Sequence, residues 1–300
     1  MEIDLSRYCW VCGGTFAQPS PTKGDVTEVD CTTCGQYDIT GSLLASRFPM
    51  PESERYRFSF WSKRRTLEGY SPVLLSDDTV EAIVANLPSP ATHEKPDILL
   101  VSLALLHPEP GNHFKLDTLR ERSLACARDP TEIGYFLKCL IGDRHYIVSQ
   151  PPGLQITGSG WERVATLSAK GGALSKTAFV AMAFNPSMLS LWDTAFYPAI
   201  KRADFEPRLA NNPAHNEQID ARIIAELKQC RFVVADVTGA NTGVYFEAGY
   251  ALGLGRSVIW TCQNKSRKDM HFDTRQYNHI LWEDATDLSE QLYYRIVATI

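Results

Sequence analysis

One stretch of the sequence, residues 230–256, constrains the fold more than any other. It reads CRFVVADVTGANTGVYFEAGYALGLGR, in which an apolar run from Phe232 to Ala235 ends at Asp236. A short continuous apolar run of this kind is typical of a central strand in a parallel sheet. The glycines and polar residues that follow predict a tight turn, and the apolar segment around Glu247 predicts a helix. The stretch therefore indicates a strand–turn–helix unit.

The rest of the C-terminal region alternates between apolar strands and amphipathic helices. Buried strands are expected at 177–184, 205–209, 231–236, 257–262 and 278–282, with helices between them and a final helix to the C-terminus. This alternation predicts an α/β domain with a parallel sheet of the flavodoxin or Rossmann type. A turn is expected at the NPSM sequence after the first strand. Ligands of such sheets bind beyond the carboxyl ends of the strands, where Asp236 falls.

Two cysteine pairs near the N-terminus have the spacing of a metal site. Cys9 and Cys12 form one CxxC motif, Cys31 and Cys34 form the other, and eighteen residues separate the pairs. This spacing fits a four-thiolate zinc site, and the lack of an export signal favours metal over disulfides. We expect one structural zinc ion in a zinc ribbon, because a closed site has no open position for catalysis. A ribbon that contacts nucleic acid or a partner is the alternative.

The middle of the chain, residues 46–170, is predicted to be helical with one hairpin. Helices are expected at 53–70, 76–87, 98–106, 116–127, 131–140 and 158–167, and the hairpin at 145–157. Helices followed by a hairpin are typical of a winged-helix-like unit, and the lack of a basic recognition helix favours dimerisation or sensing over DNA binding. The basic, aromatic segment 53–70 is expected to dock its aromatic side on the protein, with a single-stranded nucleic-acid surface as the alternative. In the docked form its basic side chains are expected to stay solvated, namely Arg55, Arg57, Lys63, Arg64 and Arg65.

Length and charge agree with this division. Three hundred residues fit two domains, or three if the first is small, and we expect a ribbon at 1–45, the helical region at 46–170 and the α/β domain at 171–300. The net charge of −5 argues against a protein that coats nucleic acid, although a local basic patch stays open. No apolar run reaches the roughly 20 residues of a membrane span. A cytoplasmic protein without a membrane partner is expected.

Four segments of the C-terminal region together resemble one family. They resemble the nucleoside 2-deoxyribosyltransferase-like superfamily, and related TIR-like domains share the pattern. The segments are FVAMAF, HNEQID, residues 230–262 and HFDTRQYNHILW. The resemblance covers roughly residues 175–300. Members of known activity cleave or exchange the N-glycosidic bond of nucleosides or their 5′-monophosphates, and some TIR relatives cleave NAD. The resemblance implies a nucleotide or nucleoside substrate and a homo-oligomer whose neighbouring subunits complete the site. We expect no organic cofactor.

The resemblance assigns roles at two acidic positions. Glu247 matches the catalytic glutamate, and Asp236 matches an acidic residue that helps to handle the leaving base. The first strand carries Met182 and Phe184 where transferases often have a tyrosine that orients the glutamate. Transfer and hydrolysis therefore both stay open.

The chemistry of these residues is consistent with such a reaction. A carboxylate beneath an anomeric carbon stabilises an oxocarbenium-like transition state or forms a covalent ester. Glu247 is expected near a helix N-terminus, where it would stay ionised at neutral pH. Asp236 is the nearest candidate to protonate the departing base, with capping of the turn as the alternative.

Further candidates for substrate binding surround the same edge of the sheet. The turn amides are expected to hold sugar hydroxyls or a phosphate, and an arginine at the end of the second strand is expected to pair with a phosphate. For each of these residues a purely structural role, in a turn, at a helix start or in solvent, is the alternative. The candidates are Thr238, Gly239, Asn241, Gly243, Arg208, His215 and Asn216.

Three functions are consistent with the sequence. The first is an N-glycosidase acting on a nucleotide or nucleoside, the second a TIR-like NAD hydrolase, and the third a non-enzymatic sensor that binds a nucleotide in the same cleft. The arrangement of modules resembles that of stress or anti-phage effectors that deplete nucleotides, so a defence role is one hypothesis.

Overall fold

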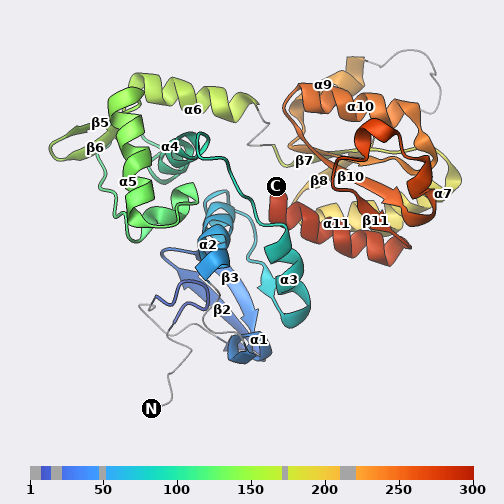
Figure 1. Ribbon diagram of the computed structural model, residues 1–300, viewed down its shortest axis with the longest axis horizontal. Helices are drawn as coiled ribbons and strands as arrows, with labels where there is room; N and C mark the ends of the chain where they lie inside the picture. Colours follow the sequence, from blue (N-terminus) through green and yellow to red (C-terminus); the bar gives the residue numbers. More distant parts are fainter. Residues whose placement is uncertain (1–7, 15–21, 47–51, 171–174, 210–220) are drawn as a thin grey trace. The chain divides into compact units, whose positions relative to one another are not determined.

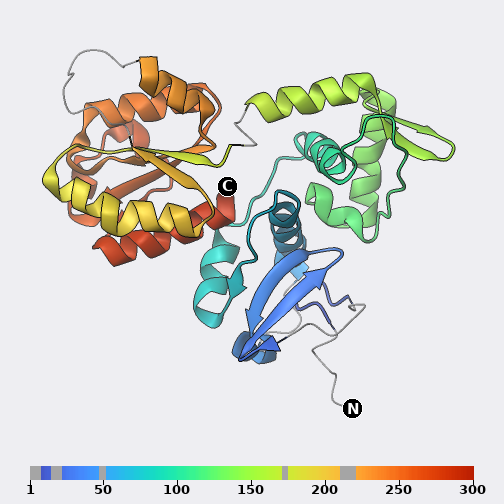
Figure 2. The same cartoon turned by 180° about the vertical axis from the view of Figure 1, so that it is seen from behind.

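The computed structural model describes residues 8–14, 22–46, 52–170, 175–209 and 221–300. The chain divides into two compact units, an N-terminal unit (Met1–Thr166) and a C-terminal unit (Leu167–Ile300), which Figures 1 and 2 show from opposite sides. The division into three domains stays a prediction. Among the described residues, no helix combines the length and the apolar character that crossing a membrane requires.

The C-terminal unit is built on a five-stranded parallel sheet with the strand order β11-β10-β9-β7-β8. Because every pair is parallel, all five carboxyl ends lie at one edge of the sheet, and Asp236 stands there opposite Thr261. The predicted α/β, Rossmann-like architecture is confirmed. The strands are β7 (Thr177–Ala181), β8 (Glu206–Leu209), β9 (Phe232–Asp236), β10 (Ser257–Gln263) and β11 (Ile280–Trp282).

Helices cover both faces of this sheet (Figures 1 and 2). One face carries α9 (Ala221–Gln229) and α10 (Thr242–Gly253). The other carries α7 (Pro186–Leu191), α8 (Tyr197–Arg202) and α11 (Ala285–Thr299), with a π-helical turn, η4 (Trp192–Phe196), joining α7 to α8. Covered on both faces, the central strands are buried along most of their length, and all five residues of β9 are buried.

The NPSM sequence differs from its prediction as a turn. The side chain of Asn185 accepts a hydrogen bond from the backbone nitrogen of Met188 at 3.0 Å, and α7 begins at Pro186. An asparagine cap followed by proline in the first helical position starts a helix. The helix therefore begins three residues earlier than the expected Leu189.

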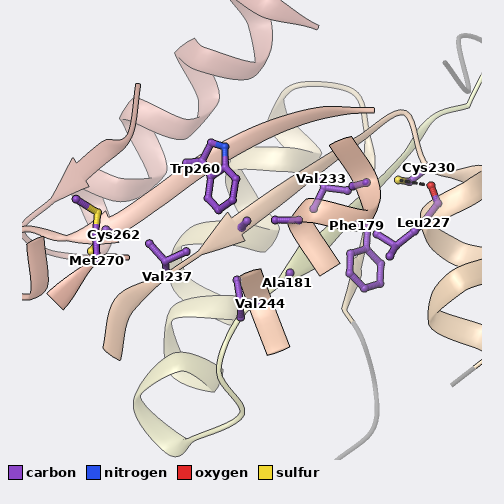
Figure 3. Close-up of a cluster of buried hydrophobic side chains, with 13 residues drawn as sticks. Phe179, Ala181, Leu227, Cys230, Val233, Val237, Val244, Trp260, Cys262 and Met270 are labelled. Carbon is purple, nitrogen blue, oxygen red and sulfur yellow. Dashed lines mark hydrogen bonds between the residues drawn. The ribbon is translucent and has the colours of Figure 1, made fainter. Parts of the chain in front are cut away.

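The core beneath α10 joins the helix to three strands of the sheet. Figure 3 shows Val244 of α10 with Phe179 of β7, Val233 of β9 and Trp260 of β10, all of them buried. Burying a side chain of this size stabilises a fold by about 1.5–3 kcal/mol. This packing fixes the position of α10, and with it the position of Glu247.

The N-terminal unit begins with a small four-stranded sheet in the order β1-β2-β3-β4. Strands β2 and β3 form an antiparallel hairpin whose turn carries Cys31 and Cys34. The elements of this region are β1 (Thr22–Lys23), β2 (Val26–Cys31), β3 (Gly35–Thr40), α1 (Gly41–Ser46), α2 (Glu52–Leu67), β4 (Leu74–Leu75) and α3 (Asp77–Ala85).

Helices and a hairpin follow in the same unit, as expected. Phe114 and Leu154 form an isolated antiparallel bridge, which adds a third backbone segment to the hairpin in a winged-helix-like arrangement. The elements are α4 (Lys95–Leu106), η2 (Glu121–Ala125), α5 (Pro130–Lys138), η3 (Cys139–Asp143), β5 (Ile147–Gln150), β6 (Gly153–Ile156) and α6 (Gly158–Lys170).

The helix expected at 116–127 is wrong in most of its length. Only the short 3₁₀ helix η2 forms there, because the Asp117 carboxylate accepts from the backbone nitrogen of Leu119 and Ser102 donates to the carbonyl of Leu124. Cys126 then takes a left-handed conformation with φ of 52° and ends the segment. Side chains that bind the backbone locally compete with helical hydrogen bonds.

The basic side chains of α2 bind within the N-terminal unit. Arg65 is buried and its guanidinium lies 4.8 Å from the ring centroid of Tyr70. Arg57 donates to the backbone carbonyl of Pro88, and Lys63 donates to that of Thr32 at 2.8 Å. These contacts favour the docking interpretation of segment 53–70 over a nucleic-acid surface. The expectation that the basic side chains stay solvated is wrong for Arg65, which packs on aromatic rings.

Candidate functional site

Asp236 is fully buried at the carboxyl end of β9, where it accepts three hydrogen bonds. Its Oδ1 accepts from the backbone nitrogen of Thr238 at 3.1 Å. Its Oδ2 accepts from Thr261 Oγ1 at 2.6 Å and from Trp282 Nε1 at 3.0 Å. The carboxyl group therefore joins the turn after β9 to the neighbouring strand β10 and to β11, the next strand beyond it.

The electrostatics of Asp236 follow from this enclosure. Burial raises the pKa of Asp236 above its ordinary value, while the hydrogen bonds from Thr261, Thr238 and Trp282 oppose the shift. In this geometry Asp236 holds the turn, which is the capping alternative. Its role toward a leaving base stays a prediction.

The turn after Asp236 exposes its backbone. Thr238 Oγ1 accepts from the backbone nitrogen of Gln263 at 2.9 Å, which ties the turn to the end of β10. Gly239 and Ala240 follow with φ of 74° and 53°, so two consecutive residues are left-handed. Glycine adopts this conformation at little cost, and Gly239 lies exposed at the edge of the sheet.

Asn241 and Gly243 begin the helix that carries Glu247. The Asn241 side chain accepts from the backbone nitrogens of Gly243 at 3.0 Å and Val244 at 3.4 Å, so it caps α10. A Cβ atom at Gly243 would lie 3.2 Å from Asn241 Oδ1. Both residues therefore have a structural role in this geometry, and a role in substrate binding stays a prediction.

Glu247 lies on the flank of α10 that is turned toward β7. Val244 and Ala248 face the sheet, and Tyr245 lies on the opposite flank, where its ring is 6.4 Å from that of Trp260 in β10. Successive helical residues are about 100° apart, which places Glu247 on the other flank. That flank faces the point between β9 and β7 where the strand order reverses, which is where open α/β sheets bind their ligands.

Glu247 is partly buried, and burial raises its pKa to about 7. Among the described residues, none donates a hydrogen bond or forms an ion pair with its carboxylate. The expectation that the helix N-terminus keeps Glu247 ionised at neutral pH is wrong. Glu247 is the sixth residue of α10, beyond the first turn in which the helix dipole acts, so desolvation decides its pKa.

The remaining candidates do not converge on Glu247 in the described part of the chain. Arg208 is exposed on the edge strand β8, opposite Phe179 in the sheet register. Lys201, and to a lesser extent Arg208, lowers the pKa of Glu206. His215 and Asn216 lie outside the described residues.

Two contacts of the site have no signal in the sequence that we identified. Trp282 reaches Asp236 from 46 residues away, and Thr261 reaches it from 25 residues away. Only their position at the carboxyl ends of predicted strands could have suggested them. The sequence also placed Phe184 wrongly. It was expected in the first buried strand, but it follows the end of β7 and is 40% exposed.

The four N-terminal cysteines form a cluster with the geometry of a metal site. All four Sγ atoms lie within 4.8 Å of one another, and those of Cys12 and Cys31 are 3.6 Å apart. Zinc–sulfur bonds of about 2.3 Å in a tetrahedron place the sulfurs about 3.8 Å apart, so the donor set fits zinc. Burial raises the pKa of the Cys9 and Cys34 thiols above the ordinary value.

Comparison with known proteins agrees with the site in the C-terminal unit. No curated protein matches the chain. Residues 175–280, roughly a third of the chain, match the family model of nucleoside 2-deoxyribosyltransferase. The matched region runs from the start of β7 to the start of β11 and includes α10 with Glu247. The resemblance of the C-terminal region to the nucleoside 2-deoxyribosyltransferase family is thereby confirmed.

Proposed function

We propose that the C-terminal unit cleaves, or transfers at, the N-glycosidic bond of a nucleotide or nucleoside, with Glu247 as the reacting carboxylate. The observation that carries the proposal is the placement of Glu247. It lies on the flank of α10 that faces the topological switch point, and burial raises its pKa to about 7. A desolvated carboxyl group in that position is a functional candidate. The family match supplies the class of substrate.

The chemistry follows from a carboxylate beneath the anomeric carbon. In its ionised form, Glu247 adds one carboxylate oxygen to C1′ as the C1′–N bond breaks. The electron pair of that bond leaves with the base, which takes up a proton from water. The ester is then cleaved by water, which gives hydrolysis, or by a second base, which gives transfer. Low hydration makes the ionised carboxylate a stronger nucleophile than one in bulk solvent.

Other residues at the same edge hold the substrate in this proposal. Phe184 presents an exposed aromatic ring just after β7, which suits stacking against a base. The exposed turn at 239–243 offers backbone amides for sugar hydroxyls or a phosphate. Asp236 keeps that turn in place through its hydrogen bond to the backbone of Thr238. Arg208 is the candidate for a 5′-phosphate.

The test is release of free base, measured by chromatography, from a panel of nucleosides, 5′-monophosphates and NAD. Glu247→Gln keeps the size of the side chain but removes the nucleophile, and we expect release to fall by at least about 10³-fold. Glu290→Gln is the matched control, because Glu290 is an exposed carboxylate of the same unit that pairs with Arg202. Undiminished release by Glu247→Gln would refute the proposed role.

The same panel separates the alternatives. Release of nicotinamide from NAD alone favours the TIR-like hydrolase. Binding of a nucleotide without release from any substrate favours the sensor. A nucleotide-depleting defence role requires release from abundant cellular nucleotides, so it is the narrower form of the first proposal.

A further inference from the structure

We propose that Tyr37 and Ser59 donate hydrogen bonds to metal-bound thiolates, and that the metal centre fastens α2 and η2 to the ribbon. This inference concerns the N-terminal unit and does not depend on the proposed function. It goes beyond the four ligands themselves, because it assigns a role in metal affinity to two residues outside the CxxC motifs.

Each of the four sulfurs lies beside one hydrogen-bond donor. Tyr37 Oη is 3.1 Å from Cys9 Sγ, and Ser59 Oγ is 3.2 Å from Cys34 Sγ. Both hydroxyl-bearing side chains are buried, with exposures of 1% and 2%. A zinc-bound thiolate has no proton to give, so the hydroxyl is the donor once the metal is bound.

Backbone nitrogens serve the other two sulfurs. The nitrogen of Gly14 lies 3.4 Å from Cys12 Sγ, and that of Cys34 lies 3.4 Å from Cys31 Sγ. Four thiolates around one divalent cation carry a net charge of about −2. One donor for each sulfur spreads that charge, and such outer partners orient the ligands and strengthen metal binding.

The turn that holds Cys31 and Cys34 is enclosed by α2 and η2. Lys63 of α2 donates to the carbonyl of Thr32 at 2.8 Å, and Ser123 of η2 donates to the carbonyl of Thr33 at 2.6 Å. The backbone nitrogen of Gln36 donates to Thr66 Oγ1 at 2.7 Å. These hydrogen bonds tie the turn of the second CxxC motif to both helices.

Close packing of Gly35 against α2 completes the enclosure. Gly35 has φ of 77°, and a Cβ atom there would collide with Thr66 Oγ1 and lie 3.0 Å from the backbone of Lys63. Only glycine fits between the second CxxC motif and the helix. The metal, the turn and α2 are therefore parts of one packed arrangement, and loss of the metal frees Ser59 and loosens α2.

The experiment measures zinc affinity of the full chain by competition with a chromophoric chelator. Ser59→Ala and Tyr37→Phe are each expected to weaken zinc binding by about 10-fold or more, as other outer-shell changes do. Ser62→Ala is the matched control, because Ser62 is equally buried on α2 and donates to the carbonyl of Gln36 instead of a sulfur. It is expected to leave zinc affinity within about twofold of the wild type.

Cobalt substitution gives a second measurement that packing alone would not change. Removing a donor to a thiolate shifts the sulfur-to-cobalt charge-transfer band, so both variants are expected to shift it and Ser62→Ala is not. Unchanged affinity with an unchanged band would overturn the proposal. Equal weakening of zinc binding by Ser62→Ala would show a general packing effect and overturn it as well.

Discussion

The cysteine cluster of the N-terminal unit and the carboxyl edge of the C-terminal unit both hold acidic groups away from water. The two regions differ in whether every such group has a hydrogen-bond donor beside it. Every sulfur of the cluster lies beside a hydrogen-bond donor. Asp236 is treated in the same way, with three donors around a fully buried carboxyl group. Glu247 is partly buried, and among the described residues it has no donor and no counter-ion.

This difference separates groups that hold the fold from a group that is poised to react. A buried polar group with all its partners stabilises one arrangement and is closed to ligands. A desolvated carboxyl group without partners destabilises the fold when it ionises, and it gains a partner only from a ligand. This difference supports the proposal that Glu247 is the reacting group, with Asp236 and the cysteines holding the fold.

The largest effect is expected from removal of zinc. Structural zinc sites contribute an apparent binding free energy of about 10–16 kcal/mol in small domains, comparable to the whole stability of a domain. With a strong chelator, amide hydrogen exchange should become fast in β2, β3 and α2 and stay slow in β9 and β10. Retained protection in α2 after the metal is gone would break the proposed link between the cluster and that helix.

The next effect is a pH-dependent gain in stability from Glu247→Gln. The folded-state pKa of Glu247, about 7, lies above its ordinary value of 4.5, so the protonated form favours folding. The contribution of Glu247 to the free energy of unfolding of the wild type is fully present below pH 4.5 and is lost as the pH rises through 7. This loss amounts to up to about 3 kcal/mol.

Thermal melts of the two proteins at several pH values measure this effect. The glutamine variant should melt several degrees above the wild type at pH 8 and at the same temperature at pH 4. The reaction should show the opposite dependence, because the ionised form is the nucleophile, and base release should rise with pH to a plateau above about 7. A variant that is less stable at pH 8 would mean that Glu247 has a structural partner.

The smallest effect is expected from Asp236→Asn. An amide in this position can accept from Trp282 or from the backbone of Thr238, but its NH₂ group then faces the other donor. Leaving a buried donor without an acceptor costs about 1–3 kcal/mol. Chemical denaturation should show a loss of about 2 kcal/mol. We expect kcat to fall less than in Glu247→Gln, because the hydrogen bonds of Asp236 hold the turn. A stable Asp236→Asn that releases no base would instead favour a direct role for Asp236.

The fold of the C-terminal unit could be predicted because its signals are local. The apolar run from Phe232 to Ala235 is long enough to span a buried strand, and the Asn241 cap marks the start of α10. The segment at 116–127 could not be predicted in the same way. Its backbone donates to the Asp117 carboxylate and accepts from Ser102, and the partner of Ser102 is 22 residues away.

The candidate residues could be named from the sequence, but the environments of their side chains could not. The spacing of the cysteines is visible in the sequence, because each CxxC motif needs only a local turn to present two sulfurs. Tyr37 and Ser59 have no such signal, since Ser59 is brought to Cys34 by the packing of a helix 25 residues later. The same holds for Trp282, which reaches Asp236 only because β11 and β9 lie in one sheet.

The sequence alone determined the α/β alternation, the spacing of the four cysteines and the presence of Glu247 and Asp236 at one edge of a sheet. Periodicity and spacing are properties of neighbouring residues, so they can be read along the chain. Only the tertiary structure decided which carboxyl group is enclosed and which has no partner in the part of the chain that the structure describes. Burial and hydrogen bonding are set by residues distant in sequence, and these two quantities separate the turn-holding Asp236 from Glu247.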